Sequence, residues 1–381
     1  MKAGLRGVSL ALAAAILLSA PASADIKSFN AAMQAGNFKL AASEAASTWP
    51  TLDKTRDDLA IIAREFGFAA YMSGDFAAAR TFATEALKES GDTPLVAASR
   101  VQSAVLLRAA EHRSGATDQT RDALVQALQA RATLPGLDGI SFLAAQAAVN
   151  YDFGKARWAP AHESSGVAKT LTEAGGPAYR VPALRFEMVQ AAASHVLSDG
   201  PAGRDRLSAL LETVTTEINA AASDAAAQSL VALYWEVSAW ATATSDDRRG
   251  RVSMGNKPPA VAAPAGAVEE VTRAMRLLAT DPIPACKVRP DFDQLPRMPE
   301  FKADNKFNGV ILVRVDIDDK GAMTNVKALA SAPDPALGPA LVAYFAKARR
   351  NFIVPGEPWG PSCSVARVGY TFTWIFDTNR F

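Results

Sequence analysis

Residues 309–321, GVILVRVDIDDKG, decide the fold of the last part of this 381-residue chain. Along them the apolar side chains recur at every second position, as Ile311, Val313, Val315 and Ile317. This alternation is typical of a half-buried strand, so we expect a strand over Val310–Asp318. The segment Asp318-Asp319-Lys320-Gly321 predicts a tight turn, because Gly321 adopts positive φ angles without strain. Met323–Ala330 returns as a second strand, which makes the pair an antiparallel hairpin.

Two further elements follow this hairpin. Pro335–Arg350 predicts a helix whose apolar side holds Leu337, Leu341, Tyr344, Phe345 and Ala348. Val365–Phe376 predicts a last strand with one alternating apolar face: Val368, Tyr370, Phe372, Trp374 and Phe376. We expect that face to pack against the helix, while the alternate positions hold Arg367, Gly369, Thr371 and Thr373. The order strand, strand, helix, strand predicts a small module over residues 285–381.

This module resembles the C-terminal domain of the TonB family of energy transducers. The matching positions are Gly309-Val310, Ile317–Gly321 at the turn, Asn325-Val326, Ala330-Ser331 and Phe352–Pro355. Upstream, Met298-Pro299 lies near the aromatic-proline site of the family. The sequence departs from the family pattern at two places, because Met298 replaces the aromatic residue and Asn351 stands at the tryptophan site after the helix.

The resemblance implies a mode of binding. In the TonB family an extended peptide of an outer-membrane receptor adds as an extra strand beside an exposed edge strand. Unpaired backbone N–H and C=O groups supply the affinity in this mode, and side-chain pockets supply selectivity. We therefore expect the last strand to be the partner-strand edge, at Arg367, Gly369, Thr371 and Thr373. The expected partner is an envelope protein or an outer-membrane receptor peptide.

Residues 25–244 have a helical pattern, with apolar residues at three- and four-residue steps. The clearest window is Asp57–Ser90, where Ser73-Gly74-Asp75 separates two apolar helix faces and predicts a helical hairpin. The window resembles a tetratricopeptide repeat in its small residue Gly67, its turn Gly74-Asp75-Phe76, and its small or apolar sites Ala79, Ala86 and Leu87. Gly36-Asn37-Phe38 echoes the turn 38 residues earlier. Such a stack either binds protein segments on a concave face or serves as a spacer or dimer surface.

The expected fold class is therefore α+β, in a multidomain chain. It comprises a signal peptide (1–24), an all-α helical-hairpin solenoid of tetratricopeptide type (25–244), a linker (245–284) and the TonB-like module (285–381). The linker is rich in proline and short polar residues around Lys257–Pro264, which do not build a packed face. A short helix is expected within it, at Ala267–Ala279.

Met1–Ala24 has the three parts of a secretory signal. Lys2 and Arg6 precede an apolar run, Val8–Leu18, and a small-residue end, Ala22-Ser23-Ala24. The run is shorter than the roughly 20 residues that span a bilayer, so we expect cleavage before Asp25 and a periplasmic protein without a membrane span. Cleavage leaves 38 basic and 39 acidic residues, and this balance argues against nucleic-acid or anionic-lipid binding.

Cys286 and Cys363 are the two cysteines of the chain, and both lie in the expected tail module. We expect them to form a structural disulfide, because the periplasm is oxidising. A reactive thiol is the alternative, but neither cysteine belongs to a C-x-x-C pair, and no histidine lies near either in the sequence.

Motifs for catalysis or cofactor binding are not evident. The histidines lack the spacing of a zinc site: His112, His162 and His195. Asp316 resembles the first residue of a calcium loop, but Lys320 and Lys327 occupy positions that need carboxylates. Ser164-Ser165-Gly166 lacks the flanking glycine of a nucleophile elbow. We expect a protein without enzymatic activity, metal or cofactor.

These observations favour a non-enzymatic periplasmic protein that binds envelope or outer-membrane partners by strand addition. The alternative is a TonB-type energy transducer that couples the inner membrane to outer-membrane receptor transport, with the N-terminal segment retained as an anchor. Such transducers usually also have a long proline-rich spacer, whereas the proline-rich segment near Lys257 is short. An envelope hydrolase, the third class, needs an acid, a base and a nucleophile in one cleft.

Overall fold

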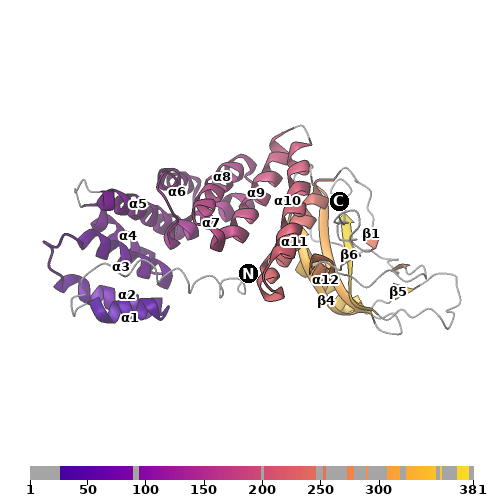
Figure 1. The fold of residues 1–381 in the computed structure, drawn as a ribbon, viewed down its shortest axis with the longest axis horizontal. Helices are drawn as coiled ribbons and strands as arrows, with labels where there is room; N and C mark the ends of the chain where they lie inside the picture. Colours follow the sequence, from indigo (N-terminus) through magenta and orange to yellow (C-terminus); the bar gives the residue numbers. More distant parts are fainter. Residues whose placement is uncertain are drawn as a thin grey trace. The chain divides into compact units, whose positions relative to one another are not determined.

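The computed structural model describes residues 26–88, 94–198, 201–245, 252–254, 273–278, 289–290, 307–317, 323–348, 352–353 and 367–376 (Figure 1). The chain divides into two compact units, Met1–Phe186 and Glu187–Phe381, and each is described by itself. The first unit is helical, and the second adds a small antiparallel sheet near the C-terminus. The predicted α+β layout is therefore confirmed. The signal peptide and the pairing of Cys286 with Cys363 lie outside the described residues.

The first unit consists of helical hairpins that pack in sequence. Their helices are α1 Lys27–Gln34, α2 Phe38–Thr48, α3 Leu59–Ser73, α4 Phe76–Leu87, α5 Pro94–Ser114, α6 Asp118–Arg131, α7 Gly139–Gly154 and α8 Trp158–Ala174. Short 3-10 turns, η2 (Trp49–Thr51) and η3 (Pro177–Tyr179), follow α2 and α8. α3 packs against α4 and α5, and α5 packs against α6 and α7, so each hairpin contacts the next. The hairpin predicted within Asp57–Ser90 is confirmed as α3–α4.

Three hairpin turns share one backbone geometry: Gly36-Asn37-Phe38, Gly74-Asp75-Phe76 and Ala156-Arg157-Trp158. The first residue of each turn is left-handed, with φ of 67°, 91° and 52°. The N–H of the second residue donates to the carbonyl five residues earlier, at 2.9 Å in all three turns. The side chains of Asn37 and Asp75 also cap the helices that follow. The third turn carried no recognisable signal, because alanine replaces the glycine that favours left-handed backbone.

Close helix packing explains the small residue Gly67 of α3. A Cβ atom on Gly67 would lie 2.7 Å from Leu106 Cδ2 of α5 and 3.2 Å from Phe82 Cβ of α4. The Phe82 ring packs edge-on against Phe66 of α3, with ring centroids 5.7 Å apart. Helices α3, α4 and α5 therefore meet at a point where the packed core leaves room for a hydrogen atom only.

The second unit begins within α9 (Arg180–Leu197). Its further helices are α10 Ala202–Ala220, α11 Asp224–Ala243, α12 Arg273–Leu278 and α13 Leu337–Ala348. Its strands are β1 Val252–Met254, β2 Arg289–Pro290, β3 Gly309–Ile317, β4 Met323–Ala332, β5 Phe352–Ile353 and β6 Arg367–Phe376. β3, β4, α13 and β6 follow the predicted order. The sequence pattern did not indicate β1, β2 or β5, because strands this short carry too few alternations.

Helices cover both faces of the sheet. The described strands form an antiparallel four-stranded sheet in the order β1-β6-β3-β4, and β2 pairs with β5 separately. α13 covers the face of Ile311, because Phe345 packs against Trp374, the residue paired with Ile311, at 5.9 Å. Val310 and Leu312 point to the other face and are buried as well. α11, which packs against β3 and β4, covers this second face (Figure 1).

The compact units do not follow the predicted domain boundaries at 244 and 285. α11 belongs to the same unit as the sheet, because the start of β3 is tied to the end of α11. The Asn308 N–H donates to the Ala243 carbonyl at 2.9 Å, and Asn308 Nδ2 donates to the Ser245 carbonyl at 3.2 Å. Phe307 packs edge-on against Trp240, with ring centroids 5.3 Å apart. Helical periodicity shows that α11 has an apolar face, and it does not show which element covers that face.

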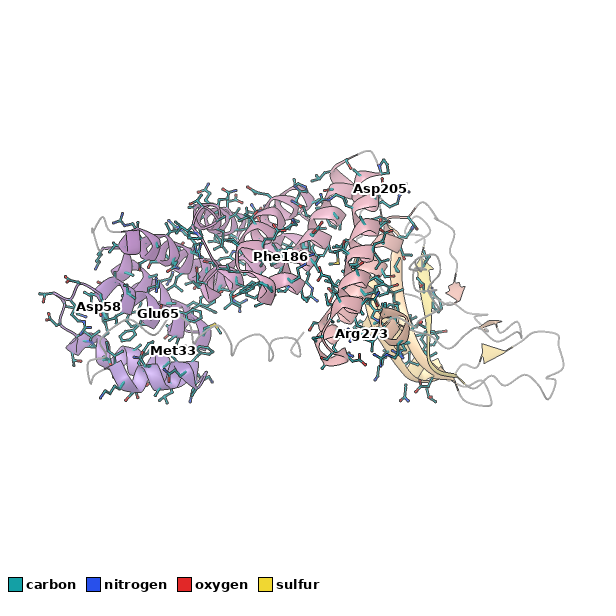
Figure 2. The ribbon with its side chains drawn as sticks, viewed as in Figure 1. Met33, Asp58, Glu65, Phe186, Asp205 and Arg273 are labelled. Carbon is teal, nitrogen blue, oxygen red and sulfur yellow. The ribbon has the colours of Figure 1, made fainter. Side chains whose placement is uncertain are left out.

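α12 confirms the short helix expected within Ala267–Ala279, and hydrogen bonds hold it to the turn between α10 and α11. Arg273 begins α12 (Figure 2). Its Nε donates to Asp224 Oδ1 at 3.1 Å, and its Nη1 donates to the Asn219 carbonyl at 3.1 Å. The Ala274 N–H donates to Asn219 Oδ1 at 2.7 Å. The chain after α11 is therefore fixed again at Arg273 on the same unit.

We predict that Gly67→Leu destabilises the protein by about 1–3 kcal/mol or more, because the new side chain overpacks the α3–α4–α5 contact. The matched control is Gly154→Leu at the end of α7, where an added Cβ has no atom within 4 Å. Thermal unfolding followed by circular dichroism measures both. Equal melting temperatures for the two variants would contradict the close approach at Gly67.

Candidate functional site

The predicted partner-strand edge lies on β6, and its residues are less accessible than expected. Thr371 and Thr373 are 3% and 2% exposed, and Gly369 is also buried. Thr371 pairs with Arg314 of β3, and its hydroxyl has no hydrogen-bond partner within the described part of the chain. Arg367 begins the strand, where it pairs with Ile317. Any binding at this edge therefore depends on backbone groups.

The prediction that β6 is a free edge is wrong for Phe372–Trp374. On the side away from β3, these residues pair antiparallel with β1: Val252 with Trp374, Ser253 with Thr373, and Met254 with Phe372. The physical reason is that backbone N–H and C=O groups at a sheet edge pair with any extended backbone within reach, including the same chain. In the part of the chain that the structure describes, Arg367–Thr371 has no strand on that side.

The opposite edge of the sheet is β4, and its shape opposes strand addition. The pairing of β3 with β4 is irregular at two points, between Leu312 and Val313 and between Arg314 and Asp316. Near the second point Asn325 has a left-handed φ of 49°, and the exposed Lys327 follows two residues later. Bulges and edge lysines are devices that keep an edge from pairing with other strands.

Asp316 holds the strands together where the sheet is irregular. Its Oδ2 accepts a hydrogen bond from Asn325 Nδ2 of β4 at 2.7 Å, and its Oδ1 accepts one from the Gly369 N–H of β6 at 2.7 Å. These two bonds lower the pKa of Asp316, the Asn325 bond most. Gly369 has φ of 67°, and a Cβ there would lie 2.5 Å from Arg314 Nη2. Asp316 of β3 therefore links β4 and β6 through side-chain hydrogen bonds.

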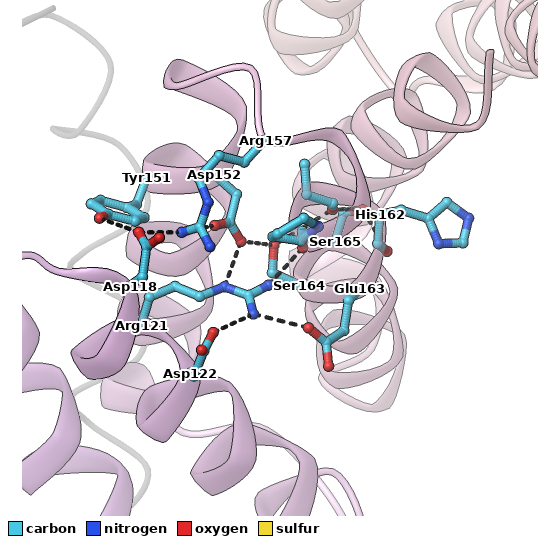
Figure 3. A network of polar contacts seen from close by, with 12 residues as sticks. Asp118, Arg121, Asp122, Tyr151, Asp152, Arg157, His162, Glu163, Ser164 and Ser165 are labelled. Carbon is cyan, nitrogen blue, oxygen red and sulfur yellow. Dashed lines mark hydrogen bonds and ion pairs between the residues drawn. The ribbon is translucent and has the colours of Figure 1, made fainter. Parts of the chain in front are cut away.

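A buried ion-pair network lies in the first unit, between α6, α7 and α8 (Figure 3). Arg121 of α6 and Asp152 of α7 are 3% and 0% exposed, and Arg121 Nε donates to Asp152 Oδ2 at 2.7 Å. The rest of the guanidinium is also occupied, because Nη1 contacts Asp122 and Glu163 and Nη2 donates to the Pro160 carbonyl at 2.6 Å. Arg157 Nη1 lies 3.3 Å from Asp152 Oδ1. Burial raises the pKa of Asp152, while the bond from Arg121 opposes that rise.

The network brings a serine, an acid and a histidine near one another without forming a catalytic triad. Ser164 Oγ donates directly to Asp152 Oδ2 at 2.9 Å, so no base lies between the two. The His162 ring points away from this pair in Figure 3. A triad needs the histidine to accept the serine proton. The geometry of Ser164 and Asp152 therefore supports a structural role.

One feature of the sequence indicates this network: a charged residue, Arg121, at an apolar position of a helix. Arg121 occupies the buried stripe of α6 together with Leu124, Val125 and Leu128. A charged side chain on an apolar stripe needs a buried partner, because an unpaired charge in the core is costly. Arg131 on the same helix follows this rule, because its Nε donates to Asp138 Oδ2 at 2.8 Å.

His112 borders the network and is 3% exposed. Its Nδ1 lies 3.1 Å from Thr120 Oγ1, and its ring packs edge-on against Tyr151 at 5.0 Å. Burial lowers the pKa of His112 below its ordinary value of 6.5. Three nearby positive charges lower this pKa further: Arg113, Arg121 and Lys155.

Comparison of the chain with protein-family models, curated proteins and solved structures gave no match. In the described part of the chain, no helix is long and apolar enough to cross a membrane. The described residues also contain no group of three or more histidine, cysteine or acidic side chains that could hold a metal ion.

We predict that Asp152→Ala lowers the free energy of unfolding by about 3–5 kcal/mol, because it leaves the buried Arg121 without its closest carboxylate. The control is Asp122→Ala, which removes another carboxylate partner of Arg121, but one whose side chain is 58% exposed. The control should cost no more than about 1 kcal/mol. Urea unfolding followed by circular dichroism measures both changes. Similar losses for both variants would show that burial of the pair does not matter.

We predict that His112 makes the first unit less stable in acid. Its pKa is lowered in the folded state, so the unfolded chain takes up the proton first as the pH falls below 6.5. The contribution of neutral His112 to the free energy of unfolding is fully present above pH 6.5. It is lost as the pH falls from 6.5 toward the lower pKa of the folded state. The variant His112→Gln should lose this part of the pH dependence in urea unfolding at about pH 7.5 and about pH 5.5. If the free energy of unfolding differs between the two pH values by the same amount in His112→Gln as in the wild type, the assignment to His112 is wrong.

Proposed function

We propose that the chain is a non-enzymatic periplasmic protein that binds an extended segment of an envelope or outer-membrane protein by strand addition at β6. The observation that carries the proposal is the pairing of β1 with β6. Three residues of the chain already form an antiparallel ladder on the outer side of β6, so that side accepts a strand. The resemblance to the TonB C-terminal domain assigns the partner strand to the same place.

The layering of the second unit supports an edge as the binding surface. α11 and α13 pack against β3 and β4 from the two faces of the sheet, and the unpaired backbone donors and acceptors of the sheet lie along its edges. The β4 edge shifts register at two points and carries Lys327, whereas β6 pairs in regular register with β3 from Gly309–Phe376 to Val315–Tyr370 and shifts once, between Val315 and Ile317, near the left-handed Gly369. A regular edge offers evenly aligned hydrogen-bonding groups, which is the basis of β-augmentation. β6 is therefore the better of the two edges.

The first unit fits the same role. Its hairpins share a repeated turn and stack in sequence, as in tetratricopeptide-type solenoids, which bury their core between neighbouring repeats and leave a long surface for protein segments. The best candidate for hydrolytic chemistry, the pair Ser164 and Asp152, is engaged in internal hydrogen bonds. We therefore assign protein binding to this unit as well.

The variant Thr371→Pro is a poor test of strand addition, because Thr371 is buried and pairs with Arg314 of β3, so the proline would disturb the sheet itself. A better test selects peptides for the full chain from a library of random linear peptides displayed on phage. We predict that selected peptides slow hydrogen exchange of the backbone amides in Arg367–Phe376. The amides of β4 in the same protein are the internal control and should not change. Among selected peptides that protect the second unit, protection confined to β4 would overturn strand addition at β6.

A further inference from the structure

We propose that β1 is an internal occupant of the β6 edge, which a partner strand must displace in order to bind. The proposal rests on the proposed function, because it concerns regulation of the same edge. β1 has three residues, whereas β6 has ten, so β1 pairs with only part of the edge. A partner strand that spans β6 makes more backbone hydrogen bonds than β1 does.

The uncovered part of β6 gives a partner a place to start. β1 pairs with Phe372–Trp374, and in the described part of the chain Arg367–Thr371 has no strand on that side. A partner strand that pairs there first can extend toward Trp374 and remove β1 one residue at a time. The three residue pairs of β1 are fewer than the roughly five or six residues of an ordinary strand, so its displacement breaks few bonds.

β1 stays close to the edge after it is displaced. Ser245 precedes it by a short segment and accepts a hydrogen bond from Asn308, the residue directly before β3. After β1 the chain is fixed again at Arg273, which is bonded to Asp224 and Asn219. Tethering on both sides makes return to β6 an intramolecular step, with an effective concentration of about millimolar for short linkers. β1 therefore acts as a reversible competitor.

The register of β1 also defines the chemistry of the partner segment. Directly opposed residues of an antiparallel pair share one face of the sheet. Val252 and Met254 oppose Trp374 and Phe372, and Ser253 between them opposes Thr373. A segment that replaces β1 therefore carries an apolar residue, a small polar residue and a second apolar residue in succession, and it runs antiparallel to β6.

The test uses a fluorescent synthetic peptide with the sequence of Arg248–Lys257 and the full chain. The open variant carries Val252→Pro and Ser253→Pro. Of two consecutive residues in a strand, one directs its N–H toward β6, so replacing both by proline removes that donor. Val261→Pro, in the same proline-containing stretch but outside β1, is the matched control. Circular dichroism checks that the variants fold alike, and a scrambled peptide controls for nonspecific binding.

If β1 occupies the edge nine-tenths of the time, the dissociation constant of the peptide falls about tenfold in the open variant and stays unchanged in Val261→Pro. Hydrogen exchange should slow in Arg367–Phe376 when the peptide binds. Equal affinities for wild type and open variant, with protection of β6 in both, would overturn the role of β1 and leave strand addition standing. Absence of β6 protection in the open variant would overturn both proposals.

Discussion

The second unit depends on the burial of β3 from both sides. This strand lies between β6 and β4, and its successive side chains, from Val310 to Val313, are buried on alternate faces. A small sheet cannot bury two apolar faces by itself, so it needs a helix on each. α13 follows β4 directly and supplies one helix, while α11 comes from the other side of the sequence and supplies the second. The sheet therefore depends on α11, a helix that ends more than 60 residues before β3 begins.

This layering limits where another polypeptide can bind to the sheet. With helices on both faces, the unpaired backbone groups of the described sheet lie along its edges. Irregular pairing at Asp316 and Leu312 makes β4 a poor template, whereas β6 already holds a strand of the same chain. An edge that pairs so readily would also promote aggregation if it were left open. Under the proposal, the short internal strand β1 protects this edge and gives way to a partner strand, which connects the proposed function with the role of β1.

The helices of the first unit are held together by close packing and by a buried ion pair. Small residues such as Gly67 allow the helices to approach, and the aromatic rings of Phe66 and Phe82 fill the space beside them. The buried pair of Arg121 and Asp152 adds polar bonds that are satisfied in one arrangement of α6, α7 and α8. A buried charge without its partner is costly, so we expect such a pair to favour one packing of neighbouring hairpins over others.

Local patterns in the sequence were sufficient for the longer elements and their order, and they did not indicate the short strands β1, β2 and β5. Alternation predicted β3 and β6, the turn after β3 predicted the returning strand β4, helical period predicted α3, α4 and α13, and the glycines at 36 and 74 predicted two turns, because each of these signals acts within a few residues. The third turn has no local sequence signal, because Ala156 takes a backbone conformation that alanine rarely adopts. The polar network has no local sequence signal that pairs its members, because Arg121 and Asp152 are 31 positions apart and meet only when α6 packs on α7.

Local sequence patterns specify an α+β chain with helical hairpins first and a strand-strand-helix-strand tail after them. Tertiary structure alone decided that α11 belongs with the tail, that Thr371 and Thr373 are buried, and that β1 covers part of the β6 edge. The physical reason is that alternation and helical period report which face of an element is apolar, whereas the element that covers that face, or pairs with that edge, is selected by contacts between distant parts of the chain.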